Sequence, residues 1–185
     1  MKFWGESILG LLGILVLVVA ISGCTSSNVF ENNVASFDIP VNWTVDDETI
    51  NNTYLYVKLT PSEELIKSNP SEGFLEIEIT ELQSNSIPSE WMDGIEQEGF
   101  ADSPKFQVLK RENVTVDGQP GDWLVYNDVN PEDLTFSGPV YTISDILFQK
   151  NGKTYRINVW VPKGSYTDTD EAAALNVIIS TIKIK

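Results

Sequence analysis

The clearest structural signal in this chain is residues 141–161, with the sequence YTISDILFQKNGKTYRINVWV. Two runs rich in Tyr, Ile, Val and Phe flank the pair Asn151-Gly152. Asn and Gly both tolerate the positive φ angles that a tight type I′ turn requires. The segment therefore predicts a β-hairpin whose register is set by its turn.

The same alternation of apolar and polar residues extends through much of the chain. In 54–59, Leu55, Val57 and Leu59 are separated by polar or aromatic residues, and 74–82 repeats the pattern. Such alternation is typical of strands with one buried face. Further predicted strands are 36–39 and 43–45, on either side of Pro40, and a second hairpin in which 106–116 and 122–127 are joined through 117–121.

Glu76 and Glu78 lie in one of these strands and could be proposed as an acid and base pair. Both alternate with apolar residues, so they share the polar face of a half-buried strand. Acidic residues on such a face are ordinarily solvated. We therefore expect no catalytic role for either glutamate.

Three segments carry helical signals. Residues 60–63, Thr-Pro-Ser-Glu, resemble a capping box with proline at the first helical position and predict a short helix. Residues 88–98 predict a second helix that stops at Gly99. A third begins near Asp168 and has apolar residues at helical spacing, which are Leu175, Ile178, Ile179 and Ile182. The predicted fold is α+β, with a single antiparallel β-sheet flanked by helices.

The first residues have the features of a lipoprotein signal. Lys2 precedes an apolar run, 8–21, which ends in Ser22-Gly23-Cys24 with the only cysteine of the chain. Small residues before a cleavage point fit a signal peptidase, and the new N-terminal cysteine offers a thiol for a lipid. The alternative is an uncleaved membrane helix, but about 14 apolar residues fall short of the roughly 20 that span a bilayer.

The chain would then have three parts. They are a signal peptide (1–23), a lipidated cysteine with a flexible polar tether (24–33) and a single domain (34–185). We expect the domain at the extracytoplasmic face of the cell membrane, anchored through a lipid on Cys24.

Composition excludes several classes of function. The net charge of −15 opposes direct binding to nucleic acid or to anionic lipid heads. The chain has no histidine and one cysteine, which removes the usual zinc, copper and haem ligands and the commonest nucleophile arrangements. We therefore expect no enzyme and no cofactor, and we assign no catalytic residue and no metal site.

Calcium is the one metal that these residues permit, because carboxylates are abundant. Acidic residues cluster at 46–48, at Asp128 with Asp133, and at 168–171. None of these clusters has the spacing of a calcium loop, and polar loops or a helix N-terminus explain them more simply.

Three glycosylation sequons suit an exported protein, with Asn42, Asn51 and Asn113 as acceptors. About two such matches are expected by chance in a chain with this much Asn, Ser and Thr. The three asparagines are therefore candidate modification sites only.

Trp160 is the candidate docking residue, because exposed tryptophan anchors interfaces and stacks on sugar faces. It shares the polar face of its predicted strand with Arg156 and Asn158, whereas Trp91 lies on an apolar helical face and is expected in the core. If the polar face is open, Arg156 and Trp160 form a docking patch. A covering helix would instead make Trp160 structural.

The predicted strands contain three short motifs. They are SFDIP at 36–40 with Trp43, VDGQPG at 116–121 and NGKTYRI at 151–157. This arrangement resembles the PsbP/Mog1-like family over residues 34–185, and most of all its archaeal lipoprotein members. The resemblance implies an antiparallel sheet flanked by helices.

The resemblance also implies docking instead of catalysis. Plant and cyanobacterial members are extrinsic accessory proteins of a membrane photosystem, and the eukaryotic branch binds a small GTPase. No catalytic residue set is carried over from the family, and fold transfers more safely than function. Any metal role of histidine in the plant proteins has no counterpart in a chain without histidine.

These observations predict a lipid-anchored cell-surface protein that acts as a non-catalytic accessory or binding module for an envelope component. A protein of the envelope is the expected partner. Two alternatives are an extracytoplasmic lipoprotein that binds a small ligand or calcium, and a degradative surface enzyme that uses carboxylates.

Overall fold

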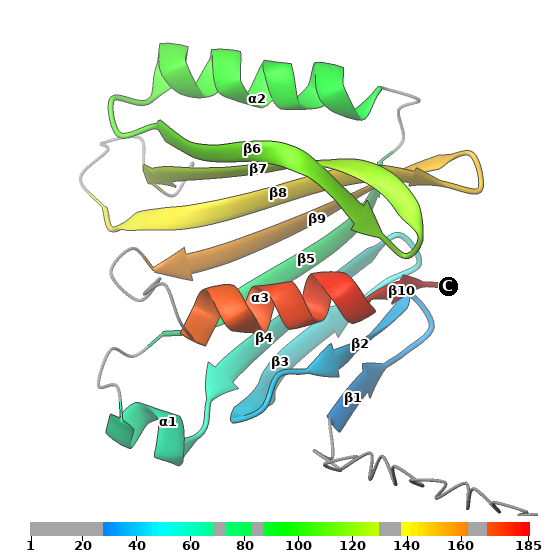
Figure 1. Cartoon of the computed structure of the whole chain (residues 1–185), viewed down its shortest axis with the longest axis vertical. Helices are drawn as coiled ribbons and strands as arrows, with labels where there is room; N and C mark the ends of the chain where they lie inside the picture. Colours follow the sequence, from blue (N-terminus) through cyan, green and yellow to red (C-terminus); the bar gives the residue numbers. More distant parts are fainter. Residues whose placement is uncertain (1–27, 69–72, 83–86, 130–137, 163–169) are drawn as a thin grey trace, which may run out of the picture.

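Figure 1 shows a computed structural model of the protein, which describes residues 28–68, 73–82, 87–129, 138–162 and 170–185. This part of the chain forms two antiparallel sheets and three helices. The predicted signal peptide, Cys24, the first residues of the predicted tether, Asp133 and Asp168 lie outside the described residues. No helix within the described ranges has the length and apolar character needed to cross a bilayer.

The large sheet has seven strands in the order β3-β4-β5-β9-β8-β7-β6, and the small sheet has three in the order β1-β2-β10. All neighbouring strands are antiparallel. The strands are β1 (Asn28–Glu31), β2 (Ala35–Ile39), β3 (Trp43–Ile50), β4 (Tyr54–Pro61), β5 (Leu75–Leu82), β6 (Gln107–Val116), β7 (Gln119–Val129), β8 (Val140–Lys150), β9 (Lys153–Pro162) and β10 (Lys183–Ile184).

The prediction of a single sheet is wrong, because the strands on the two sides of Pro40 belong to different sheets. β2 ends at Ile39, and Pro40 has no N–H to continue its ladder. Asn42 then has a φ of 68°, a left-handed conformation that Asn tolerates better than most residues. The chain turns out of the small sheet there and starts an edge strand of the large sheet at Trp43.

Both predicted hairpins are confirmed. Asn151 (φ 53°) and Gly152 (φ 77°) form the two-residue turn between β8 and β9. Asp117 (φ 50°) and Gly118 (φ 74°) form the corresponding turn between β6 and β7. This second turn is shorter than predicted, since β7 already begins at Gln119.

The edges of the large sheet are β3 and β6, and each has an irregular register. The irregularity lies between Val45 and Asp47 in β3, and between Val108 and Lys110 in β6. Most side chains of both strands are exposed. A bulge of this kind bends the edge and interrupts its row of unpaired backbone groups.

α3 (Asp170–Thr181) and the small sheet cover one face of the large sheet, which we call the inner face (Figure 1). The apolar residues predicted for the last helix all enter this core, and Ile178 and Ile182 are fully buried, although Ile182 follows the last residue of α3. Burial of one such side chain stabilises the fold by roughly 1.5–3 kcal/mol. The helical spacing in the sequence therefore identified the correct face of α3.

α2 (Pro88–Asp102) packs on the opposite face, which we call the outer face, over β7 and β8. Met92 is fully buried in a cluster with Leu124, Ile143 and Leu147. The predicted stop at Gly99 is wrong, because the helix continues to Asp102. A Cβ at position 99 would lie 2.3 Å from the ring of Phe106, so Gly99 serves the close packing of α2.

α1 (Glu63–Ser68) starts later than the predicted capping box. Pro61 is the last residue of β4 and lies opposite Trp43 in β3. Ser62 takes over the capping role, since its Oγ accepts a hydrogen bond from the N–H of Leu65 at 3.4 Å. Thr60 therefore belongs to the strand, because pairing with β3 extends β4 through the proline.

Part of the predicted tether is folded. Residues 28–31 form β1, and Asn28 lies opposite Ile39 in β2. Phe30 is buried and stacks on Phe37, with the ring centroids 4.9 Å apart. Phe30 supplies the apolar side chain that ties this polar segment to the core. Strand β1 therefore lies within the segment 24–33 that was predicted as a tether.

Candidate functional site

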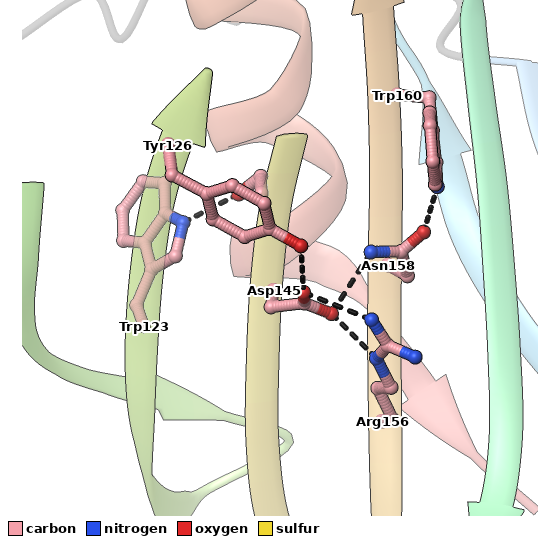
Figure 2. Close-up of polar contacts among 7 residues, drawn as sticks. Trp123, Tyr126, Asp145, Arg156, Asn158 and Trp160 are labelled. Atoms are coloured by element: carbon pink, nitrogen blue, oxygen red, sulfur yellow. Dashed lines mark hydrogen bonds and ion pairs between the residues drawn. The ribbon is translucent and has the colours of Figure 1, made fainter. Parts of the chain in front are cut away.

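The outer face contains a polar cluster centred on Asp145 (Figure 2). The Asp145 carboxylate is fully buried and forms two hydrogen bonds with the Arg156 guanidinium, from Nε to Oδ1 at 2.5 Å and from Nη2 to Oδ2 at 2.9 Å. The Tyr126 hydroxyl donates to Oδ2 at 2.9 Å, and the Asn158 amide donates to Oδ1 at 2.9 Å. We call these four residues the Asp145 cluster.

Three neighbouring strands position the cluster. Asp145 lies in β8, directly opposite Asn158 in β9, and Tyr126 lies in β7. Arg156 is two residues before Asn158 and therefore shares its face of β9. The register of the β8–β9 hairpin is thus what brings the carboxylate and the guanidinium together.

The electrostatics of the cluster hold its protons in place. Burial raises the pKa of Tyr126, and the charge of Asp145 and the hydrogen bond to it raise this pKa further. Burial opposes the positive charge of Arg156, but the hydrogen bond and the charge of Asp145 outweigh it and raise the pKa of Arg156. The Trp91 ring of α2 also lies over the guanidinium, with its centroid 5.6 Å from Cζ.

Tyr126 and Arg156 consequently keep their protons far above neutral pH, and neither is poised to exchange one with a substrate. Both carboxylate oxygens of Asp145 already accept hydrogen bonds from its three partners. The cluster is therefore suited to holding β7, β8, β9 and α2 in one arrangement, and not to acid–base chemistry.

Next to the region that α2 covers, the outer face of β4, β5 and β9 carries half-buried aromatic and acidic side chains. The Tyr54 hydroxyl donates to Glu78 Oε1 at 3.3 Å, and the Tyr56 hydroxyl donates to Glu76 Oε1 at 3.1 Å. Trp160 lies opposite Glu76 in the neighbouring strand. We call Tyr54, Tyr56, Glu76, Glu78 and Trp160 the aromatic-acidic face.

The two phenols of this face stay protonated. Burial raises the pKa of Tyr54 to about 12, with further contributions from the charge of Glu78 and the hydrogen bond to it. Burial raises the pKa of Tyr56 to about 12 as well, with the same contributions from Glu76. Both glutamates lie on the polar face of β5, as predicted. They are half-buried, and each accepts a hydrogen bond from a tyrosine hydroxyl.

Arg156 and Trp160, the predicted docking residues, do lie on the same face of β9. Arg156 is engaged by Asp145 and covered by Trp91. The Trp160 indole N–H donates to Asn158 Oδ1 (Figure 2), and its ring meets Tyr141 edge-on at 5.6 Å. Trp160 is half-buried and packs against the apolar residues beneath α2. A docking role for the two residues stays a prediction.

The other tryptophans of the described chain are structural. Trp91, which the sequence places in the core, is half-buried between the apolar residues beneath α2 and the Arg156 guanidinium. Trp43 and Trp123 are buried in the inner core. The Trp123 indole N–H donates to Ser144 Oγ at 2.5 Å.

The sequence analysis missed Asp145 and Tyr126. The available signal was an acidic residue within the apolar run ISDILF (143–148). Counting outward from the Asn151-Gly152 turn would have placed Asp145 opposite Asn158 and on the face of Arg156. Because an acidic residue is almost never fully buried unless it is paired, this placement predicts an ion pair between Asp145 and Arg156.

The sequence model of the PsbP-like protein family matches residues 18–184. The chain belongs to the PsbP-like family. Its structure is similar to LpqN of Mycobacterium tuberculosis, a protein involved in cell envelope biogenesis, with a TM-score of 0.54, 12% identity, and coverage of 88% of this chain and 87% of LpqN. It is also similar to a point mutant of the protein Mog1, with a TM-score of 0.51, 11% identity, and coverage of 85% of this chain and 96% of Mog1.

Cyanobacterial PsbP (CyanoP) of Synechocystis sp. PCC 6803 matches with a TM-score of 0.49 and 14% identity, over 89% of this chain and 96% of CyanoP. No curated protein matches the chain in sequence. At these identities, the likeness to LpqN and Mog1 shows the fold alone. The predicted PsbP/Mog1-like fold is confirmed, whereas the archaeal lipoprotein assignment stays a prediction.

The remaining candidate residues of this PsbP-like chain are dispersed. Asn42, Asn51 and Asn113 are exposed, and Asn51 Oδ1 accepts a hydrogen bond from the Thr53 N–H at 2.9 Å. Asp128 accepts a hydrogen bond from Ser103 Oγ at 2.5 Å. Across the described ranges, no three acidic or cysteine side chains gather in a way that could hold a metal ion.

Proposed function

We propose that this PsbP-like protein is a non-catalytic accessory protein of the cell envelope, anchored on the extracytoplasmic membrane surface by a lipid on Cys24. It binds a protein partner through the aromatic-acidic face. That face is the observation that carries the proposal. It presents phenols, an indole and carboxylates on three adjacent strands, in a geometry that the Asp145 cluster keeps rigid.

The chemistry of the face favours a basic partner. Two positive side chains of the strands that form this face are compensated, Arg156 by Asp145 and Lys58 by Asp46 at 3.9 Å. Aromatic rings and carboxylates together attract Arg and Lys side chains through cation–π contacts and charge-assisted hydrogen bonds. The net charge of −15 also draws positively charged partners from solution. We therefore place an Arg- or Lys-bearing protein segment on this face.

Two further observations support the accessory role. The ionisable groups of the Asp145 cluster hydrogen-bond to one another, so none of them is poised to transfer a proton to a ligand. The fold is shared with LpqN, which functions in cell envelope biogenesis. This likeness supports an envelope component as the partner.

A site-specific photocrosslinker at Tyr56 tests the binding face in native membranes. A crosslinker at Thr115, an exposed position on edge strand β6, is the matched control. We expect a single stoichiometric adduct from position 56 whose crosslinked peptide contains Arg or Lys, and no such adduct from position 115. The double variant Glu76→Gln with Glu78→Gln should greatly reduce the yield without changing the thermal unfolding midpoint.

Recovery of the protein without an adduct at position 56, or equal adducts at both positions, would refute the proposed binding face. Mass spectrometry of the same detergent extract tests the anchor separately. A lipid mass on a chain that begins at Cys24 supports the anchor, and a chain that still carries residues 1–23 contradicts it.

A further inference from the structure

We propose that the end of the domain opposite α2 rests on the bilayer surface and fixes the orientation of the molecule. This inference depends on the lipid anchor proposed above. We call this end the apolar end and define it by four exposed aliphatic residues. They are Val41 (63% exposed), Val29 (55%), Ile66 (38%) and Val177 (37%).

A groove of about 240 Å³ lies at the centre of the apolar end. The β2–β3 turn contributes Pro40 and Val41, α1 contributes Leu65, and α3 contributes Ala174 and Val177. Exposure of these apolar groups to water is unfavourable, so contact of the groove with a hydrocarbon phase lowers the free energy. Ile87, Phe100 and Leu109 are also exposed. The groove beside α2, of about 290 Å³, is lined by Glu90 and Glu98 as well as by Trp91 and Ile95, and these two carboxylates disfavour a hydrocarbon phase.

The path of the chain brings a lipid to this groove. The first described residue, Asn28, lies opposite Ile39, and the next residue, Pro40, lines the groove. Even a fully extended chain spans at most about 14 Å over the four residues from Cys24 to Asn28. A lipid on Cys24 therefore enters the bilayer within about 14 Å of Asn28. A tether of about ten residues would have left the orientation free, but β1 shortens it.

The charge of the domain determines which bilayer it accepts. Glu63 and Glu64 are exposed at the start of α1, next to Leu65 of the groove, and the whole chain carries a net charge of −15. An anionic surface would repel this end. A zwitterionic surface allows the aliphatic side chains to enter the boundary between head groups and acyl chains, which interfacial residues reach at a depth of about 5–10 Å.

This placement orients the functional surfaces. Figure 1 shows α1 and the start of β1 at one end of the molecule and α2 at the other. With the apolar end on the bilayer, α2 points away from the membrane. The strands of the large sheet lie between the two ends, so the aromatic-acidic face is presented sideways to neighbouring membrane proteins.

Spin labelling of the full lipidated chain in phosphatidylcholine vesicles tests the orientation. Cys24 is the only cysteine of the chain, and in the proposed anchor its thiol carries the lipid, so one introduced cysteine carries the label. Val41→Cys places the label at the apolar end, and Gln97→Cys, at an exposed position of α2, is the matched control. We expect the ratio of oxygen to nickel-chelate accessibility to be several-fold higher at position 41 than at position 97.

Three results would overturn the inference, and they differ in what they imply. Vesicle-bound protein with both labels equally accessible to the nickel chelate would refute the orientation but keep the anchor. Protein that does not float with the vesicles, and that takes up a second label at Cys24, would refute the anchor as well. A label at Val41→Cys that is shielded from both reagents, with dipolar broadening, would show that a second copy covers the groove.

Discussion

Replacing Asp145 with leucine is expected to destabilise the domain strongly. The substitution removes a fully buried carboxylate and leaves Arg156, Tyr126 and Asn158 without their common acceptor. Loss of one partner from a buried ion pair costs about 3–5 kcal/mol. The Arg156 side chain is 30% exposed, so water relieves part of this penalty and we expect the lower end of that range. For a domain of this size, about 3 kcal/mol lowers the unfolding midpoint by roughly 6–12 °C.

The double variant Asp145→Leu with Arg156→Met should recover most of that stability, because apolar replacement of both members of a buried pair is often neutral. Lys153→Ala is the matched control on the same strand, since Lys153 pairs with Glu81 at 2.8 Å on the surface, and it should leave the midpoint unchanged. Urea and thermal unfolding followed by circular dichroism measure these proteins together with the single Arg156→Met variant. The reasoning fails if the Asp145 variant melts with the control, or if the double variant loses as much as the two single variants combined.

Two further predictions concern other parts of the fold. Burial raises the pKa of Asp117, but hydrogen bonds from Lys150 (2.6 Å) and from the backbone of β10 outweigh it, so the folded pKa lies below the ordinary 3.8. The ionised carboxylate stabilises the fold above that ordinary pKa, and this stabilisation is lost as the pH falls through the lower folded pKa. The difference in urea midpoint between the natural protein and the Asp117→Asn variant should therefore become smaller below about pH 4. A difference that does not change with pH would contradict this. In α2, Gly99→Ala should cost about 1–3 kcal/mol through its clash with Phe106. Gly94→Ala, with open space around its Cβ, should stabilise by about 0.5–1 kcal/mol, and equal thermal shifts for the two would refute the packing argument.

The sequence predicted the elements of this fold better than their arrangement. Alternation in 54–59 and 74–82 correctly gave β4 and β5, and the Asn151-Gly152 turn gave the β8–β9 hairpin, because these signals are local. The division into two sheets was missed. It depends on the turn at Pro40 and Asn42, whose effect on direction is not visible in a periodic pattern.

The boundaries that were wrong involve long-range contacts. Gly99 looks like a helix stop, yet its role is set by Phe106, which packs against it. Pro61 looks like the first residue of a helix, yet pairing with Trp43 keeps it in a strand. In each case a tertiary contact outweighs a local preference.

The functional surface was predicted in part for the same reason. The strand period placed Arg156 and Trp160 on one face, which is correct. It could not show that Arg156 is neutralised by Asp145, because that pairing requires the register of two strands. Nor could it show that Tyr54 and Tyr56 hydrogen-bond to glutamates of the neighbouring strand, since residues far apart in the chain meet only after the sheet forms.

The irregular edges of the large sheet have a consequence for crowding. At high protein concentration, two regular, unpaired edge strands would join copies of a domain into extended sheets. The bulge of β3 and the exposed acidic residues Asp47 and Glu48 interrupt one such edge. The bulge of β6, beside the charged side chains of Lys110 and Arg111, interrupts the other. Both edges thus disfavour fibre growth, so a dense population of these domains is expected to stay dispersed.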